Sequence, residues 1–227
     1  MMVDMAKYNE NQKQMHGMIQ NLRGSMRVYC RVKPLHSFYE DELNESVQSI
    51  MRKSAPEDIT DCIKFHEPII QTGGAPSKLT SLDIQFSSGE PTTFHLDGIF
   101  KQTSTQKAVF NEVQPFITSA INGENVCIFA YGQTGSGKTH TMEGPNADML
   151  FDETTFNVHE LSGILPRTGI FLFDTMRRME KDLKRTFRLE ISAIEVYCDT
   201  VRDLFSSELG IVDLLTDPQT RQVVIKD

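Results

Sequence analysis

The sequence predicts an α/β fold in which helices flank a central, mostly buried sheet. Helical and strand patterns alternate along the 227 residues, and a glycine-rich segment at 132–139 lies between an expected strand and an expected helix. Apolar residues make up 39% of the chain, which is enough to fill a core. This alternation is typical of a sheet buried between helices.

Residues 1–24 carry a heptad pattern that predicts one helix. Its seam residues are spaced alternately four and three apart: Met1, Met5, Tyr8, Gln12, Met15, Ile19 and Leu22. Two interpretations stay open. The segment is either the end of a longer coiled coil that binds a partner helix, or a frayed tail or a helix packed on the domain. Gly24 is expected to end the helix.

The next elements are a strand, a hairpin and a long helix. Residues 26–32 read as the first strand, which Lys33-Pro34 ends. Most of 36–92 is polar and hard to interpret, with a hairpin expected from Ser81 to Phe94. An amphipathic helix is predicted over 104–122, bent at Pro115. Its expected buried face consists of Val109, Val113, Phe116, Ile117, Ala120 and Ile121.

Short elements follow the glycine-rich segment. We expect a helix over 138–143, an irregular loop to Gly163, and a second helix after Pro166. Asp174 could end an apolar strand, but the apolar residues around it keep helical spacing, which favours an exposed position on that helix. A strand is predicted over 187–193, a helical turn over 201–205, and two strands within 211–227.

Charge and hydropathy argue against several classes of function. The 31 acidic residues outnumber the 23 basic ones, whereas nucleic-acid-binding domains usually have a basic face, so no nucleic-acid partner is expected. No apolar run approaches the ~20 residues that cross a bilayer, and no membrane partner is expected. Four cysteines far apart in the sequence favour free thiols in a reducing, cytoplasmic compartment. The histidines show no ligand spacing, so no structural metal is predicted.

Residues 132–139 fill every fixed position of the phosphate-binding pattern G-x-x-x-x-G-K-[ST]. The apolar run at 125–131 is expected as a buried strand, the context in which this pattern binds a nucleoside triphosphate. Backbone N–H groups of such a loop converge on the phosphates, while the lysine reaches the β- and γ-phosphates and the threonine hydroxyl binds Mg²⁺. The candidate residues are Gly132, Gln133, Thr134, Gly135, Ser136, Gly137, Lys138 and, for the metal, Thr139.

The segment from Ile128 to Gly144 resembles the phosphate-loop signature of the kinesin motor domain, a much longer string than a bare P-loop. Residues 27–34, 164–167 and 195–205 are similar to further kinesin segments in the same order. The resemblance implies a P-loop NTPase-type motor fold with ATP and Mg²⁺ as its ligands. It also implies that Arg31 and Pro34 border the adenine, with His140 on the other face. Judged without the family, a solvent-facing helix residue is the alternative interpretation of His140.

Some features depart from the kinesin pattern. Lys33 stands where the family usually has arginine, which puts that contact in doubt because lysine lacks the planar fork. The two switch segments, N-x-x-S-S-R and D-L-A-G-S-E, do not occur, so the domain is expected to be truncated before them. Positioning and electrostatics supply nearly all catalysis of phosphoryl transfer. We therefore name no catalytic residue and expect weak nucleotide binding, poor hydrolysis and apolar sheet edges exposed to solvent.

The leading hypothesis is the ATP-binding part of a microtubule motor, which couples ATP hydrolysis to movement and works on the cytoskeleton in the cytoplasm. The junction at 22–24 resembles the neck of C-terminal-motor, minus-end-directed kinesins. Residues 1–24 are thus expected to be a neck helix or coiled-coil stub, and 25–227 the N-terminal part of the motor domain. Two alternatives stay open: a short, degenerate motor-like module that binds a partner without ATP turnover, and an unrelated P-loop kinase with Asp174 on a strand.

Overall fold

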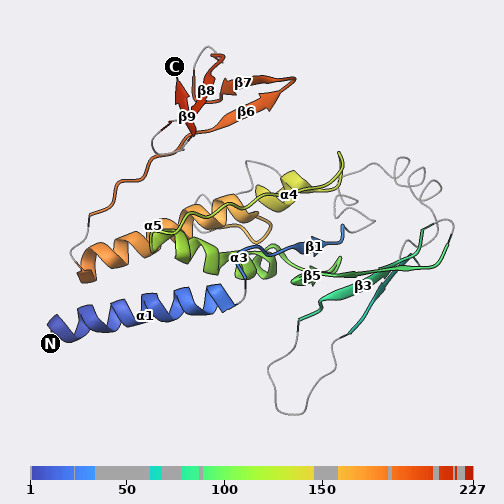
Figure 1. Cartoon of the computed structure of the whole chain (residues 1–227), viewed down its shortest axis with the longest axis horizontal. Helices are drawn as coiled ribbons and strands as arrows, with labels where there is room; N and C mark the ends of the chain where they lie inside the picture. Colours follow the sequence, from blue (N-terminus) through green and yellow to red (C-terminus); the bar gives the residue numbers. More distant parts are fainter. Residues whose placement is uncertain are drawn as a thin grey trace. The chain divides into compact units, whose positions relative to one another are not determined.

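The computed structural model describes residues 2–22, 24–33, 62–67, 78–86, 89–145, 158–183, 186–206, 210–216, 218 and 223–226. Along these residues one helix is followed by five strands, three helices and four strands (Figure 1). Helices and strands both contribute, which confirms the expected α/β class, but they come in groups instead of alternating. The chain divides into two compact units, Met1–Thr175 and Met176–Asp227. The described strands form four separate sheets of two or three strands each, instead of one continuous central sheet.

The first predicted strand is confirmed and is shorter than expected. β1 (Tyr29–Arg31) pairs in parallel with β5 (Gly98–Phe100). Hydrogen bonds continue the pairing beyond both ends of the ladder, since Asp97 N donates to Val28 O at 3.0 Å and Val32 N donates to Phe100 O at 2.9 Å. The pairing fixes the position of the carboxyl end of β1, where the candidate adenine residues begin.

A three-stranded antiparallel sheet lies next along the chain. The predicted hairpin is confirmed as β3 (Ser81–Ile84) paired with β4 (Thr92–His95), and β2 (Ile63–Phe65), which was not predicted, adds to β3. Leu82 of β3 is only 2% exposed and anchors this sheet.

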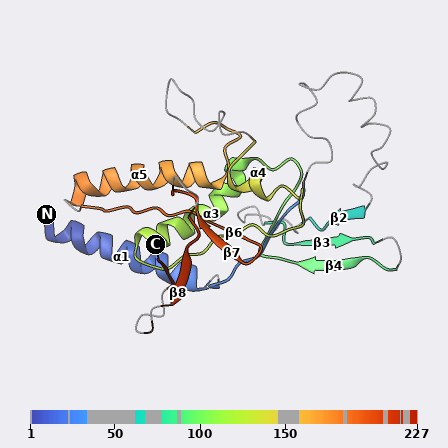
Figure 2. The same ribbon diagram turned by 90° about the horizontal axis from the view of Figure 1, so that it is seen from above.

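The core of the first unit lies between two helices. α3 (Gln106–Ile121) starts at the N-cap Thr105, whose side chain accepts from Ala108 N. α5 (Ile164–Leu183) begins two residues before Pro166. Figures 1 and 2 both show α3 and the first part of α5 side by side. The buried core consists of Val109, Phe110, Val113, Ile117 and Ile164.

The buried face of α3 differs in part from the prediction. Val109, Val113 and Ile117 are buried as expected, whereas Ala120 is exposed. The polar Ser119 is buried instead, at 2% exposure. The reason is that α3 is covered on two sides, by α5 and by the N-terminal helix, so burial spreads beyond one apolar stripe.

The N-terminal helix α1 (Met2–Leu22) forms as predicted and ends just before Gly24, which has a φ of 90°. One of its faces packs on α3, where His16 Nε2 lies 3.1 Å from Pro115 O and 3.2 Å from Ser119 Oγ. The last seam residues face solvent, with Leu22 88% and Met15 60% exposed. The helix is therefore packed on the domain and still presents part of its seam.

The second unit contains the end of α5 and two hairpins, β6–β7 (Ile194–Tyr197, Thr200–Asp203) and β8–β9 (Asp213–Thr216, Val223–Lys226). The two strands expected within 211–227 are confirmed. The strand predicted over 187–193 and the helical turn over 201–205 are wrong. Cys198 and Asp199 both have positive φ, 46° and 61°, and such a pair closes a two-residue hairpin and starts β7.

The strand expected at 125–131 is also wrong. None of the described strands pairs with these residues, and Phe129 and Tyr131 are 79% and 94% exposed. Apolar composition favours a strand, but a strand forms only where a neighbour supplies hydrogen bonds.

Among the helices that the structure describes, none combines the length and the apolar character that a membrane crossing requires.

Candidate functional site

The glycine-rich loop lies directly before α4 (Lys138–Met142), as predicted. Gly135 and Gly137 have φ values of 79° and 95°, a left-handed backbone that side chains with a Cβ rarely adopt. Ser136 N donates to Gln133 O at 3.1 Å and closes the turn. The loop therefore has the tight, backbone-exposing conformation that phosphate cradles use.

Two lysines converge on the backbone of this loop. Lys138 Nζ donates to Gly132 O at 2.9 Å and to Gln133 O at 3.0 Å. Lys33 Nζ, from the segment after β1, donates to Gly135 O at 3.0 Å. The structure thus brings two ammonium groups from distant parts of the sequence to one loop. Gln133, Thr134 and Thr139 are exposed beside them.

Arg31 and His140 come together through a residue that the sequence did not single out. Arg31 Nη1 donates to Gln106 Oε1 at 2.9 Å and to Thr141 Oγ1 at 3.0 Å. Gln106 Nε2 in turn donates to His140 O at 2.7 Å. β1, α3 and α4 are joined by these bonds. Pro34, the other predicted adenine residue, lies outside the described residues.

The surroundings of His140 favour its neutral form. The residue as a whole is exposed, and partial shielding of its ring from water is the main cause that lowers the pKa of this imidazole below its usual 6.5, followed by the positive charges of Arg31 and Lys33. Burial also lowers the pKa of the Arg31 guanidinium, which nonetheless stays charged at neutral pH.

The C-terminal end of α4 is held by the segment that precedes α5. Gly163 N donates to Glu143 O at 2.8 Å, directly at the C-cap of α4. Arg167 stabilises this segment, since Nε donates to Ser162 O at 2.8 Å and Nη2 donates to Glu160 O at 2.7 Å. The two ends of the loop between Gly144 and Gly163 therefore meet at the base of the candidate site.

The described residues contain no group of three or more His, Cys, Asp or Glu side chains that could hold a metal by themselves. Asp174 lies on α5 and is exposed, as predicted, so it does not end a strand. A metal site here would need oxygen atoms from a ligand as well as Thr139 Oγ1.

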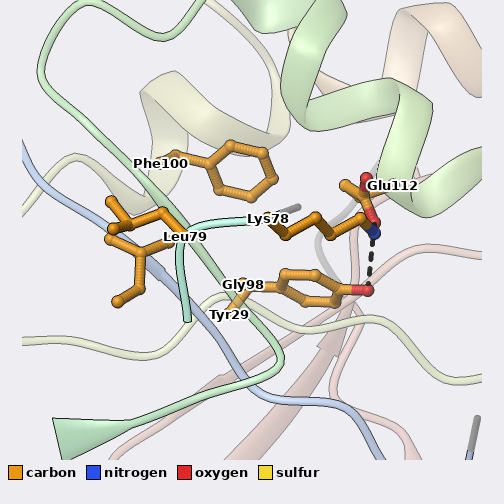
Figure 3. A pocket seen from close by; sticks show the side chains of 7 residues that line it. Tyr29, Lys78, Leu79, Gly98, Phe100 and Glu112 are labelled. Carbon is orange, nitrogen blue, oxygen red and sulfur yellow. Dashed lines mark hydrogen bonds and ion pairs between the residues drawn. The ribbon is translucent and has the colours of Figure 1, made fainter. Parts of the chain in front are cut away.

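A separate cavity of about 200 Å³ lies near the start of β5. In Figure 3 the Lys78 side chain runs between the Tyr29 and Phe100 rings toward Glu112. Lys78 and Tyr29 both donate to Glu112 Oε2, the latter at 3.4 Å. Because these polar groups satisfy one another, we interpret them as structural bonds: the bond from Tyr29 to Glu112 joins β1 to α3 beside the cavity.

The fold and the loop define an α/β protein of the P-loop type. The chain belongs to the kinesin motor-domain family, whose family model matches residues 31–227. The predicted family is therefore confirmed.

Three curated relatives illustrate the similarity. Kinesin-like protein KIF25 of Macaca fascicularis is 33% identical over 88% of this chain, and the chain spans 31% of that protein. Kinesin-like protein KIN-14O of Oryza sativa subsp. japonica is 36% identical over 82% of this chain and 23% of its own length. Kinesin-like protein KIFC1 of Rattus norvegicus is 34% identical over 86% of this chain and 26% of its own length.

Two solved structures share the fold. The motor domain of the Kar3-like kinesin from Ashbya gossypii is 29% identical, with a TM-score of 0.63 over 90% of this chain and 53% of that one. The C-terminal motor and motor homology domain of Kar3Vik1, fused to a synthetic heterodimeric coiled coil, is 26% identical, with a TM-score of 0.67 over 97% of this chain and 49% of that one. A C-terminal motor is thus among the similar structures, in line with the predicted resemblance.

Proposed function

We propose that this chain is the ATP-binding part of a microtubule motor, which couples ATP hydrolysis to movement along microtubules. The observation that carries the proposal is the loop Gly132–Thr139, with the Lys138 ammonium within 3.0 Å of its carbonyls, in a chain of the kinesin family. Since the chain spans about half of the two solved motor chains, we assign nucleotide binding to it and assign hydrolysis and movement to the complete motor.

The conformation of the loop fits a polyphosphate. A Cβ on Gly132 would lie 2.5 Å from Ser136 Oγ and 3.2 Å from Ser136 Cβ, so the Ser136 hydroxyl would have to turn away to admit a side chain there. Left-handed Gly135 and Gly137 let neighbouring N–H groups turn toward one anion. We assign the phosphates to the backbone of 132–139 and to Lys138, whose ammonium offers three donors.

Magnesium fits the same site as part of the nucleotide complex. Mg²⁺ usually binds through one or two protein oxygens, substrate phosphates and waters, instead of an all-protein cage. Thr139 offers one exposed hydroxyl beside the loop. The ion would neutralise phosphate charge; the chain's own residues would orient the phosphates.

Arg31, Pro34 and His140 are proposed to border the adenine. A half-buried guanidinium and a neutral imidazole both present flat surfaces that stack on a purine. The assignment of Arg31 and His140 to the adenine is supported by the hydrogen bonds that join them through Gln106.

We further propose that residues 1–24 form the neck and 25–227 the N-terminal part of the motor domain. The motor is proposed to act in the cytoplasm on the cytoskeleton and to move toward the minus ends of microtubules. The helix α1 leads directly into β1, as in C-terminal motors, and Met15, Ile19 and Leu22 on its exposed seam suit a coiled-coil partner.

Calorimetric titration with Mg-ATP tests nucleotide binding. We expect Lys138→Ala to weaken the affinity at least tenfold, since it removes charge-assisted bonds of about 1.5–3 kcal/mol. Lys107→Ala, on the exposed side of α3, is the matched control and should change nothing. Equal affinities for the two variants would refute the site.

A gliding assay tests the motor activity. The full-length protein that contains this chain is bound to a surface, and polarity-marked microtubules are observed on it. ATP-dependent movement toward minus ends is expected. Tight Mg-ATP binding with no turnover and no microtubule co-sedimentation would favour the degenerate module instead.

A further inference from the structure

Gln106 is a deeply buried polar residue beside the candidate site. It is the first residue of α3 and is only 3% exposed. Glutamine is usually exposed, and a buried polar side chain is informative because burial costs free energy unless its hydrogen bonds are made. The contacts of this side chain therefore indicate what it does.

Both ends of the Gln106 amide are used. Its Oε1 accepts from Arg31 Nη1 at 2.9 Å, and its Nε2 donates to His140 O at 2.7 Å. A guanidinium only donates and a carbonyl only accepts. The amide can satisfy both neighbours in one orientation only, so its oxygen and nitrogen are assigned without ambiguity.

The same amide also fixes the imidazole of His140. Gln106 Nε2 lies 3.2 Å from His140 Nε2. Because the amide nitrogen can only donate, the ring nitrogen facing it must accept, and the ring hydrogen is then on Nδ1. One side chain thus restrains the rotamer of Arg31 and both the rotamer and the tautomer of His140.

We propose that Gln106 is a positioning residue for the base side of the nucleotide site: it holds Arg31 and His140 in the arrangement that receives a purine. This inference rests on the proposed function, since those two residues are there assigned to the base. Gln106 itself does not touch the phosphates, because its bonds all go to β1 and α4 residues on the base side.

Comparing two probes on the whole chain tests the inference: Mg-ATP, which has a base, and magnesium tripolyphosphate, which has none. Gln106→Met keeps the size of the side chain but removes the amide's bonds to Arg31, to His140 O and to the His140 ring. We expect it to weaken Mg-ATP binding about tenfold, the loss of roughly one hydrogen bond's net contribution, and to leave tripolyphosphate binding within about twofold. Gln114→Met, in the same helix, is the matched control and should leave both probes unchanged.

Gln106→Glu separates the two partners of the amide. Its carboxylate still accepts from Arg31 but cannot donate to His140 O, so an intermediate loss of Mg-ATP affinity is expected. A loss as large as that of Gln106→Met would assign the effect to His140 alone.

Several results would overturn the inference. Unchanged Mg-ATP binding by Gln106→Met, or an equal loss for both probes, would show that Gln106 does not act on the base side. A ring hydrogen on His140 Nε2, detected by long-range ¹H–¹⁵N NMR of the wild-type protein, would overturn it even if the variants do not fold. Failure of the proposed function has a different signature: wild-type protein would bind neither probe, or Lys138→Ala would bind both normally.

Discussion

Replacing Gly163 with alanine should detach the segment before α5 from the end of α4. An added Cβ would lie 2.6 Å from Met142 C and O and 2.7 Å from Glu143 N, whereas ordinary contact begins at 3.4 Å. All three atoms belong to the backbone, so no side chain can turn away to make room. The segment would have to move by about 0.8 Å, the difference between these two distances.

The cost follows from two effects. Forcing a methyl group into a filled space costs about 1–3 kcal/mol, and the shift breaks the 2.8 Å bond from Gly163 N to Glu143 O, which contributes about 1 kcal/mol. We expect a loss of about 2–4 kcal/mol in the free energy of unfolding. With a urea slope of about 1–3 kcal/mol per M, the midpoint should fall by at least about 0.7 M.

Gly169→Ala provides a matched control with the opposite sign. Gly169 lies inside α5, and a Cβ there would meet nothing within 4 Å. Alanine in a helix interior should stabilise the protein by about 0.5–1 kcal/mol relative to glycine. Urea unfolding followed by circular dichroism measures both variants. Midpoints that shift in the same direction would refute the close contact between Gly163 and α4.

Three further outcomes are expected. Arg167→Met should lower the free energy of unfolding by about 2 kcal/mol through the loss of charge-assisted bonds to backbone carbonyls, with faster proteolysis in the adjoining loop. Arg167→Lys should keep only part of this stabilisation. Equal stability of the wild type and both variants would contradict this. An NMR titration should give His140 a pKa below 6.5. The neutral imidazole therefore contributes its full stabilisation above pH 6.5, and this contribution is lost as the pH falls toward the lower folded-state pKa. A pKa at or above 6.5 would be inconsistent with partial burial beside two cations. Gly137→Ala should weaken Mg-ATP binding roughly fivefold because a left-handed alanine costs about 1–2 kcal/mol. Gly123, with a similar φ of 97°, lies away from the loop, and Gly123→Ala should leave the affinity unchanged. Equal affinities of the two variants would show that the backbone of Gly137 is irrelevant to binding.

Local signals in the sequence predicted the helices and the loop well. The heptad pattern, the amphipathic spacing over 104–122 and the spacing around Asp174 all describe interactions within a few residues. The P-loop pattern likewise specifies a local backbone path, and Gly135 and Gly137 have the left-handed φ that it needs.

Features that depend on distant partners were predicted less well. Residues 125–131 have the composition of a buried strand, yet the described strands include no neighbour for them, and Tyr131 is 94% exposed. The 198–199 turn lacks the usual Asn-Gly signal, so the β6–β7 hairpin was misassigned. Gln106 was missed because a glutamine in a first helical turn normally faces solvent. Only tertiary structure brings it against Arg31 and His140.

Hydrogen–deuterium exchange of the wild-type chain, with and without Mg-ATP, tests the central claim most directly. If backbone amides before and within the first turn of α4 bind the phosphates, exchange at residues 133–139 should slow on adding Mg-ATP, and Lys138→Ala should abolish the change. Unaltered exchange in this loop at saturating Mg-ATP, with slowing elsewhere in the chain, would contradict the account.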